Sequence, residues 1–422
     1  MAPTLIGLGA LVLVANRWGQ ALLDDGVRLR ILAPPLIGRF RVGPPAGLLV
    51  LALPLAVGSL LVHWLPRFAA VARWRPLLVT GALAAAAWAV ALALVDGAAG
   101  LTRPMELPGH YLLDVGRVGS PGDFLRGFTT HIGDYGTHVR SHPPGMVLLL
   151  WAMERVGLGG SGWAAALVVV GGASAVPAVL LTTRELAGEV LARRALPFVA
   201  VAPAALYVAS TGDALFAAVA AWGVAAVVLA TGRTSGRRDA LALGGGAVFG
   251  LGLLLSYGSA LVVLLPIVAI VARRCWRVGV LSALGGSLAL GGAALAGFWW
   301  VDGLLATRLQ YLDSVASVRP YGYFLIANLA ALAIVVGPAT LAGVRRLSMP
   351  LALVVGPALA MVGIADLSGM SKGEVERIWL PFAVFLLPAA ALAAAGPNRL
   401  RLWLGAQVGV ALLVTAFVRT HW

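Results

Sequence analysis

Charged residues are scarce in this chain of 422 residues, and that scarcity excludes a water-soluble protein. Asp, Glu, Lys and Arg make up only 11% of the sequence, whereas 60% is hydrophobic. Ordinary soluble domains carry roughly a quarter charged residues. With a mean hydropathy of +0.93, we interpret the chain as one polytopic integral membrane unit.

Cysteine is almost absent as well. The single Cys275 excludes a disulfide within the chain and a thiolate zinc cluster. Neither a Gly-rich dinucleotide loop after a strand nor a Walker sequence occurs. The N-terminal MAPTLIGLGALVLVAN lacks the basic start and the cleavage site of a signal peptide, so we expect no cleaved leader.

The chain is strongly basic, with a net charge of +14 and a pI of about 11.2. Its arginines lie in pairs and triplets between apolar runs rather than on one face. This pattern is typical of membrane topology signals and not of a nucleic-acid surface, so no nucleic-acid partner is expected.

Apolar stretches of near membrane-spanning length recur along the whole chain and predict an all-α integral membrane protein with about 12 or 13 transmembrane helices. We find no internal repeat of fixed period. The stretches are 3–16, 46–65, 77–98, 162–182, 192–208, 213–231, 239–257, 258–272, 279–301, 323–343, 349–366, 377–395 and 402–419.

Alternate connections between these stretches are basic: 184–194, 233–238, 273–277, 345–346 and 399–401. The positive-inside rule places these five in the cytoplasm. The connections 102–161, 302–322 and 366–376, with the turn at Asp213, then lie outside and carry most of the acids. The same count places Arg28, Arg30, Arg39 and Arg41 outside, against the rule, unless the first stretch is only interfacial.

The long polar connection 102–161 is where we expect chemistry, because long loops without a function are uncommon. Glu106 follows a span directly, where partial desolvation favours a general base; the alternative is a plain interfacial acid. Asp213 either faces the same cavity or only N-caps a helix starting at Ala214. Asp114, Asp123 and Asp134 are less specific.

Four of the six histidines lie in this connection: His110, His131, His138 and His142. With Asp134 they are candidate ligands of a divalent cation, although no metal-site spacing is present. The alternative is hydrogen-bonded loop histidines. The prolines of SHPPG predict an amphipathic helix that begins near Gly145 and aims His142 into the cavity.

The segment SKGEVERIWLPF places Lys372, Glu374, Glu376 and Arg377 at the outer mouth of a span. A guanidinium there suits a phosphate, with Glu376 fixing it or contacting a sugar; the alternative is interfacial snorkelling. Arg308 and Arg319, with three tyrosines, form a second outer cluster.

The order of these features resembles the GT-C superfamily of lipid-phosphosugar-dependent glycosyltransferases, especially lipid A aminoarabinose transferases and protein O-mannosyltransferases. MELPGHY, with Glu106, His110 and Tyr111, resembles the acidic first-loop motif, and SHPPGMVLLLW resembles the Lys-Pro-Pro or His-Pro-Pro segment. STGDALF, GLGLLLSYG and VERIWLPF resemble three further motifs of the family. The chain departs from the family at Met105, which replaces the first acid, and at Tyr257, which replaces a lysine.

The resemblance covers about residues 77–396 and implies a GT-C catalytic module there. Residues 1–76 form an N-terminal membrane segment of open topology, and 397–422 a C-terminal helix with a short tail. The family implies an inverting transfer from a polyprenyl-phosphate sugar to an envelope glycan, lipid or protein, at the extracytoplasmic face of a bacterial plasma membrane. Mannose and arabinose are plausible donor sugars on composition alone. No cofactor is expected, with a divalent cation as the open alternative.

A transporter or flippase of a lipid-linked sugar is the competing function. Transporters concentrate ionisable groups near the bilayer midplane, whereas the predicted spans are nearly free of charge and the acids and histidines lie in outer connections. The sequence therefore favours the transferase.

Overall fold

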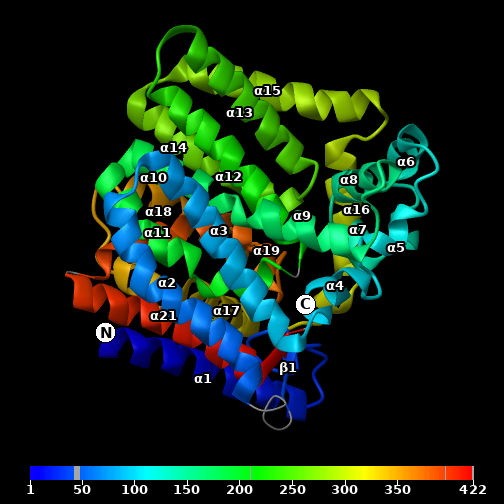
Figure 1. The fold of residues 1–422 in the computed structure, drawn as a ribbon. Helices are drawn as coiled ribbons and strands as arrows, with labels where there is room; N and C mark the ends of the chain where they lie inside the picture. Colours follow the sequence, from blue (N-terminus) through cyan, green and yellow to red (C-terminus); the bar gives the residue numbers. More distant parts are fainter. Residues whose placement is uncertain (42–47, 210, 395, 421–422) are drawn as a thin grey trace.

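The computed structural model describes residues 1–41, 48–209, 211–394 and 396–420 (Figure 1). It is an all-α bundle in which eight helical segments of the described chain are long and apolar enough to cross a membrane. They are α1 (Ala2–Asp24), η1 with α2 (Leu48–Leu51, Ala52–Val71), α3 with η2 (Trp74–Ala93, Leu94–Asp96), α9 with α10 (Ser161–Ala173, Ala175–Ala187), α12 (Gly212–Thr231), α15 (Trp276–Leu295), α17 (Tyr321–Val344) and α21 (Pro397–Phe417).

Shorter helices complete the bundle and carry the connections. In the bundle these are α11 (Glu189–Ala200), η4 (Pro203–Tyr207), α13 (Ser235–Leu253), η5 (Tyr257–Val263), α14 (Leu264–Arg273), α18 (Ala352–Leu367), α20 (Leu380–Leu386) and η7 (Leu387–Leu392). In the connections they are α4 (Ala99–Glu106), α5 (Leu112–Val115), α6 (Pro121–Gly127), η3 (Ile132–Asp134), α7 (Thr137–Arg140), α8 (Gly145–Arg155), α16 (Trp300–Leu312), η6 (Val315–Ser317) and α19 (Val375–Ile378).

The apolar stretches of the sequence fall on these helices, so the predicted helical membrane architecture is confirmed. Each stretch coincides with one helix or with two consecutive ones, as 162–182 does with α9 and α10. The helix predicted after SHPPG begins at Gly145 as α8. The predicted span 377–395 begins later, at Leu380, because Arg377 belongs to the separate short helix α19.

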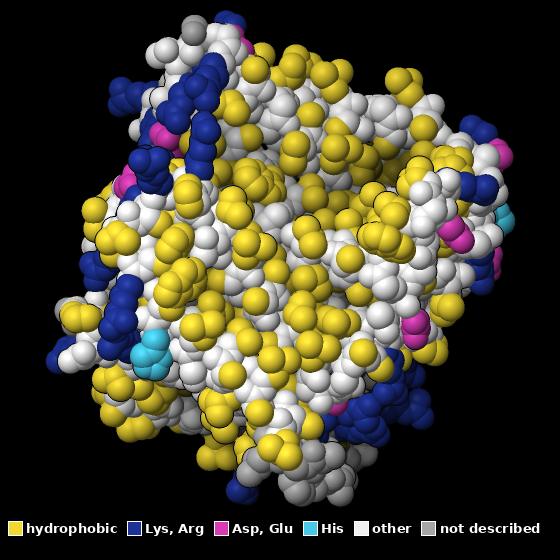
Figure 2. All heavy atoms as spheres, viewed as in Figure 1, with side chains coloured by type: hydrophobic (Ala, Val, Ile, Leu, Met, Phe, Trp, Pro, Cys, Tyr) yellow, Lys and Arg dark blue, Asp and Glu magenta, His cyan; other side chains and the backbone are white. Residues whose placement is uncertain are grey.

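The five basic connections meet at one end of the bundle. Arg233 and Arg273 both pair with Glu185, Arg194 donates to the carbonyl of Ala394, and Arg346 donates to the carbonyl of Ala393. These contacts link the connections into one network. Figure 2 shows Lys and Arg side chains along the left edge of the molecule and apolar side chains over the middle of the face.

The acid-rich connections meet at the opposite end, and the N-terminal segment lies with them. Arg377 reaches Asp213, and Arg319 donates to the carbonyls of Lys372 and Leu29. Arg41 forms an ion pair with Asp96 at 3.0 Å. The N-terminal arginines were predicted, by counting spans, to lie at the same end as the acidic connections. The structure agrees with this prediction.

The first helix is a full component of the bundle, because α1 packs along α17, with Trp18 edge-on to Tyr323. The strands of the described chain form one two-stranded antiparallel ribbon, β1 (Gly38–Phe40) with β2 (Val418–Thr420). The largest buried apolar cluster is rich in alanine, which lets the central helices approach closely.

Candidate functional site

A buried arginine with two carboxylates lies at the acid-rich end of the bundle. Nη1 of Arg377 donates to Oδ2 of Asp213 at 2.6 Å, and Nη2 donates to Oε2 of Glu374. The side chains of Arg377 and Asp213 are only 6% and 5% exposed. A buried pair of this kind is strongly destabilised by loss of one partner, so the two residues act as a unit.

Asp213 lies in the first turn of α12, but it is not the N-cap. The helix begins at Gly212 with Thr211 at the cap, two residues earlier than the sequence suggests. The carboxylate is held by Arg377 instead. The alternative that Asp213 only caps a helix starting at Ala214 is therefore wrong.

Glu374 reaches Arg377 from a strained backbone. Its φ of 63° lies in the left-handed region, directly after Gly373 at φ 92°. A non-glycine residue in this region costs roughly 1 kcal/mol or more. The Glu374 side chain is 31% exposed, so it is the more accessible of the two carboxylates on Arg377.

Aromatic and imidazole rings cover the ion pair from the long connection. The ring of Tyr111 lies 5.6 Å from His138 and 6.0 Å from His142, measured between centroids, and His110 lies 3.9 Å from His138. Phe216 of α12 closes the group at 5.2 Å from His142. Burial raises the pKa of the Tyr111 hydroxyl well above its usual value, so this tyrosine stays protonated.

His142 is a buried imidazole of the long connection. Burial lowers the pKa of the ring. Within the described chain its Nδ1 atom is buried without a hydrogen-bond partner.

A second layer of polar residues surrounds the ion pair and anchors the N-terminal segment. It consists of Lys372, Arg319 and Glu376. Oε1 of Glu376 accepts from the amide of Ile37 at 2.8 Å, and Nζ of Lys372 donates to the carbonyl of Arg319 at 3.1 Å. Burial raises the pKa of Glu376 to about 7. The expectation that Glu376 fixes the Arg377 guanidinium is corrected here, because the carboxylates on that group are Asp213 and Glu374.

One residue that the sequence did not single out, Asn328, supports this layer. Asn328 of α17 donates to Asp366 and to the carbonyl of Ser371, and it accepts from the amide of Gly373. Asn328 is a lone polar residue within an apolar span, which is the signal that points to it. It fixes the backbone directly before Glu374.

Other predicted site residues lie apart from this group. Glu106 is exposed at the end of α4 and accepts from Ser161 Oγ at 2.5 Å, while its neighbour Met105 is buried in the apolar cluster with Tyr111. Asp114 is buried and accepts from the amide of Gly136 at 2.8 Å.

Three further predicted residues are also outside the group. Tyr257 packs on Trp300, Arg308 is exposed on α16, and Asp134 lies at the surface beside His131. Within the described chain, neither the Tyr257–Trp300 contact nor the Asp134–His131 contact involves Arg377 or Asp213.

The predicted metal ligands do not converge. His131 and Asp134 are exposed with 3.4 Å between them, whereas His138 and His142 are buried near Tyr111. Among the described residues no group of three or more His, Cys, Asp or Glu side chains is placed to hold an ion. The predicted set of histidines with Asp134 does not form one donor set.

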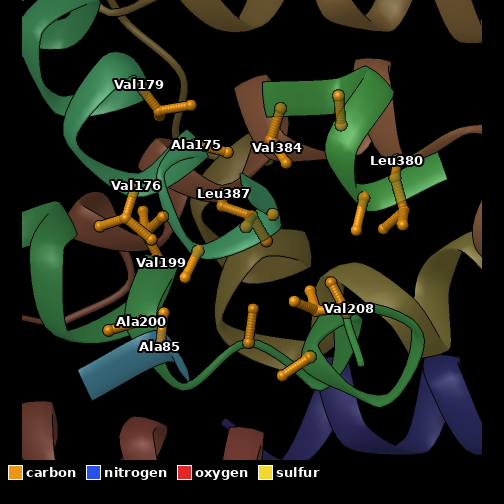
Figure 3. A pocket seen from close by; sticks show the side chains of 17 residues that line it. Ala85, Ala175, Val176, Val179, Val199, Ala200, Val208, Leu380, Val384 and Leu387 are labelled. Atoms are coloured by element: carbon orange, nitrogen blue, oxygen red, sulfur yellow. The ribbon is translucent and has the colours of Figure 1, made fainter. Parts of the chain in front are cut away.

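An apolar cavity lies inside the bundle (Figure 3). Its lining consists of Ala, Gly, Val and Leu from α3, α9, α10, α11, η4, α12, α20 and η7, with Ala202 and Val208 beside η4. Ala214 and Leu380, each close in sequence to the ion pair, belong to this lining. The cavity presents no ionisable side chain.

Comparison with known proteins gives one structural similarity. A crystal structure of the Archaeoglobus fulgidus oligosaccharyltransferase, in complex with Zn and sulfate, aligns with 81% of this chain at 17% identity and a TM-score of 0.46. The alignment covers 53% of that enzyme, so this chain spans about half its length. No protein-family model and no curated protein sequence matches the chain.

Proposed function

We propose that this protein is a membrane glycosyltransferase that moves a sugar from a polyprenyl-phosphate donor to an envelope acceptor at the acid-rich end of the bundle. The observation that carries the proposal is the buried Arg377–Asp213 pair beneath Tyr111 and His142. Three separate motifs of the sequence, around residues 111, 142 and 213, meet there with the motif at 377. The topology rule supports an extracytoplasmic face for this end, and the family resemblance implies a cell-envelope acceptor.

The reaction joins an acceptor oxygen to the anomeric carbon as the bond from that carbon to the donor phosphate breaks. A carboxylate takes the proton of the acceptor hydroxyl, and a cation stabilises the charge that grows on the departing lipid phosphate. Glu106 is the base that the sequence favours, although it lies apart from the ion pair at the end of α4. Asp213, which lies at the ion pair, is the alternative base. Arg377 is the proposed phosphate contact because guanidinium binds phosphate oxygens bidentately.

Donor binding requires a vacancy on Arg377, whose Nη atoms already contact two carboxylates. Glu374 is the carboxylate that a phosphate displaces, because it is partly exposed and its backbone is strained. Asp213 is buried on a rigid helix and stays in place. The donor phosphate then occupies the Glu374 position on Nη2.

A flippase function is less well supported, because the described interior of the bundle lacks a polar path for a sugar. Transported polar groups require polar or charged side chains along their path near the midplane. The described cavity in the bundle is lined by apolar residues instead. The ionisable groups lie at the bundle ends, where a reaction at one membrane face needs them.

The decisive experiment incubates purified protein in detergent with a panel of polyprenyl-phosphate sugars and an envelope extract, and measures sugar transfer. Detergent removes any gradient, so turnover supports an enzyme and its absence with every donor contradicts one. Asp213→Asn and Arg377→Lys test the site, with losses of at least 10²-fold expected. Asp239→Asn is the matched control, because Asp239 pairs with Arg277 at the opposite end.

A further inference from the structure

The β1–β2 ribbon places two arginines directly opposite each other. Arg39 is the register partner of Arg419, between the pairs Gly38 with Thr420 and Phe40 with Val418. Cβ atoms of directly opposite residues lie about 5 Å apart, and like charges there repel. In the described part of the chain neither guanidinium group makes an ion pair or a side-chain hydrogen bond.

The neighbouring Arg41, beside the β1–β2 ribbon, differs from Arg39 and Arg419 because a carboxylate balances its charge. It lies two residues after Arg39 and so shares its side of the strand. Its two Nη atoms contact both carboxylate oxygens of Asp96 at 3.0 and 3.1 Å. Among the described residues no carboxylate pairs with Arg39 or Arg419, so the positive pair is uncompensated there.

The ribbon begins where a membrane-spanning helix ends. α21 ends at Phe417 and β2 follows at once, and the amide of Arg41 donates to the carbonyl of Phe417. Phe40 and Phe417 are 46% and 63% exposed. Exposed aromatic side chains beside arginines at a helix end are typical of the headgroup level of a bilayer. Figure 2 shows a group of Lys and Arg at the lower right, over the region where Figure 1 labels β1.

We propose that Arg39 and Arg419 bind the phosphate of an anionic lipid headgroup, which lies between the two guanidinium groups. Guanidinium forks match phosphate oxygens bidentately, and an anion removes the repulsion across the ribbon. The site is independent of the proposed transferase activity. It also explains how arginines are tolerated at the end of the bundle that carries the acidic connections, where the topology rule disfavours them.

The test measures binding of a fluorescently labelled phosphatidylglycerol to the full-length protein in neutral detergent. Each basic residue near an anionic surface contributes about fivefold in binding, so Arg39→Gln and Arg419→Gln should each weaken it about fivefold and the double variant about 30-fold. Arg399→Gln is the matched control, because Arg399 is exposed at the opposite end of α21. An equal loss in Arg399→Gln, or none in the double variant, overturns the proposal.

Two further arms identify the ligand and guard against misfolding. Labelled phosphatidylcholine should bind without dependence on either arginine, and inorganic phosphate should displace phosphatidylglycerol only weakly. Displacement by inorganic phosphate at submillimolar concentration overturns the lipid assignment in favour of a free phosphate. In lipid-free detergent the double variant should unfold at a higher temperature than wild type, and added phosphatidylglycerol should reverse that order; an unchanged order contradicts the site.

Discussion

Burial of Glu376 should make the stability of the protein depend on pH, and Glu376→Gln should remove that dependence. Its side chain is fully buried, with Oε1 on the amide of Ile37 and Oε2 without a partner in the described chain. Burial raises its pKa from 4.5 to about 7. Glutamine keeps the shape and the acceptor for Ile37, and it does not titrate.

The sign of the effect follows from proton linkage. Below pH 4.5 the carboxyl is protonated in both states, so burial carries no charge penalty. As the pH rises toward 7 the unfolded chain loses the proton first, and stability falls; above pH 7 the loss is complete. At about 1.4 kcal/mol for each tenfold change in proton affinity, the total is about 3 kcal/mol.

The assay is thermal unfolding in neutral detergent, followed by tryptophan fluorescence from pH 4.5 to 8.5. The melting temperature of Glu376→Gln minus that of wild type should increase through this range by about 3 °C and level off above pH 8. Glu154→Gln, at an exposed acid of α8, is the control and should show a constant difference. A difference that is flat, or that falls with pH, would refute the burial argument.

Four other changes test the site and the bundle. Glu106→Gln should lower transfer by about 10²- to 10⁴-fold while folding normally; activity within threefold of wild type would move the base to Asp213. His142→Gln should lower kcat at least tenfold with little change in melting temperature, because it removes the buried imidazole that lies against Tyr111; unchanged kcat would assign His142 to packing alone. Glu374→Gln should lower the donor KM, since the competitor for Arg377 is weakened; a higher KM would show that Glu374 contacts the donor. Gly246→Val should destabilise the protein by about 1–3 kcal/mol or more in chemical unfolding, because a Cβ there lies 1.9 Å from the carbonyl oxygen of Ser282; wild-type stability would show that α13 and α15 separate easily.

Composition and periodicity were sufficient for the architecture. Long apolar runs must satisfy their backbone polar groups as helices in a membrane, and paired arginines mark one set of helix ends. Both rules depend only on local sequence. The bounds of α19 were missed, because a four-residue helix is decided by its tertiary contacts and not by its own propensity.

The side-chain partners at the site could be predicted only in part. Arg377 and Asp213 were each singled out from the sequence, but their direct pairing joins residues 164 positions apart, and no pattern of spacing encodes that. The sequence also could not show which of two nearby acids, Glu374 or Glu376, contacts Arg377. The left-handed φ of Glu374 turns its carboxylate onto Arg377, whereas the sequence analysis assigned that contact to Glu376.

The charge count of the site determines how a phosphate can enter it. Arg377 supplies one positive charge, and Asp213 and Glu374 together supply two negative charges. A phosphate added to this set without rearrangement would meet net repulsion in a partly desolvated place. Displacement of Glu374 into water leaves one carboxylate, one guanidinium and the phosphate. Under the proposed function, that exchange keeps the buried Asp213 on Arg377 and moves the more exposed carboxylate into water.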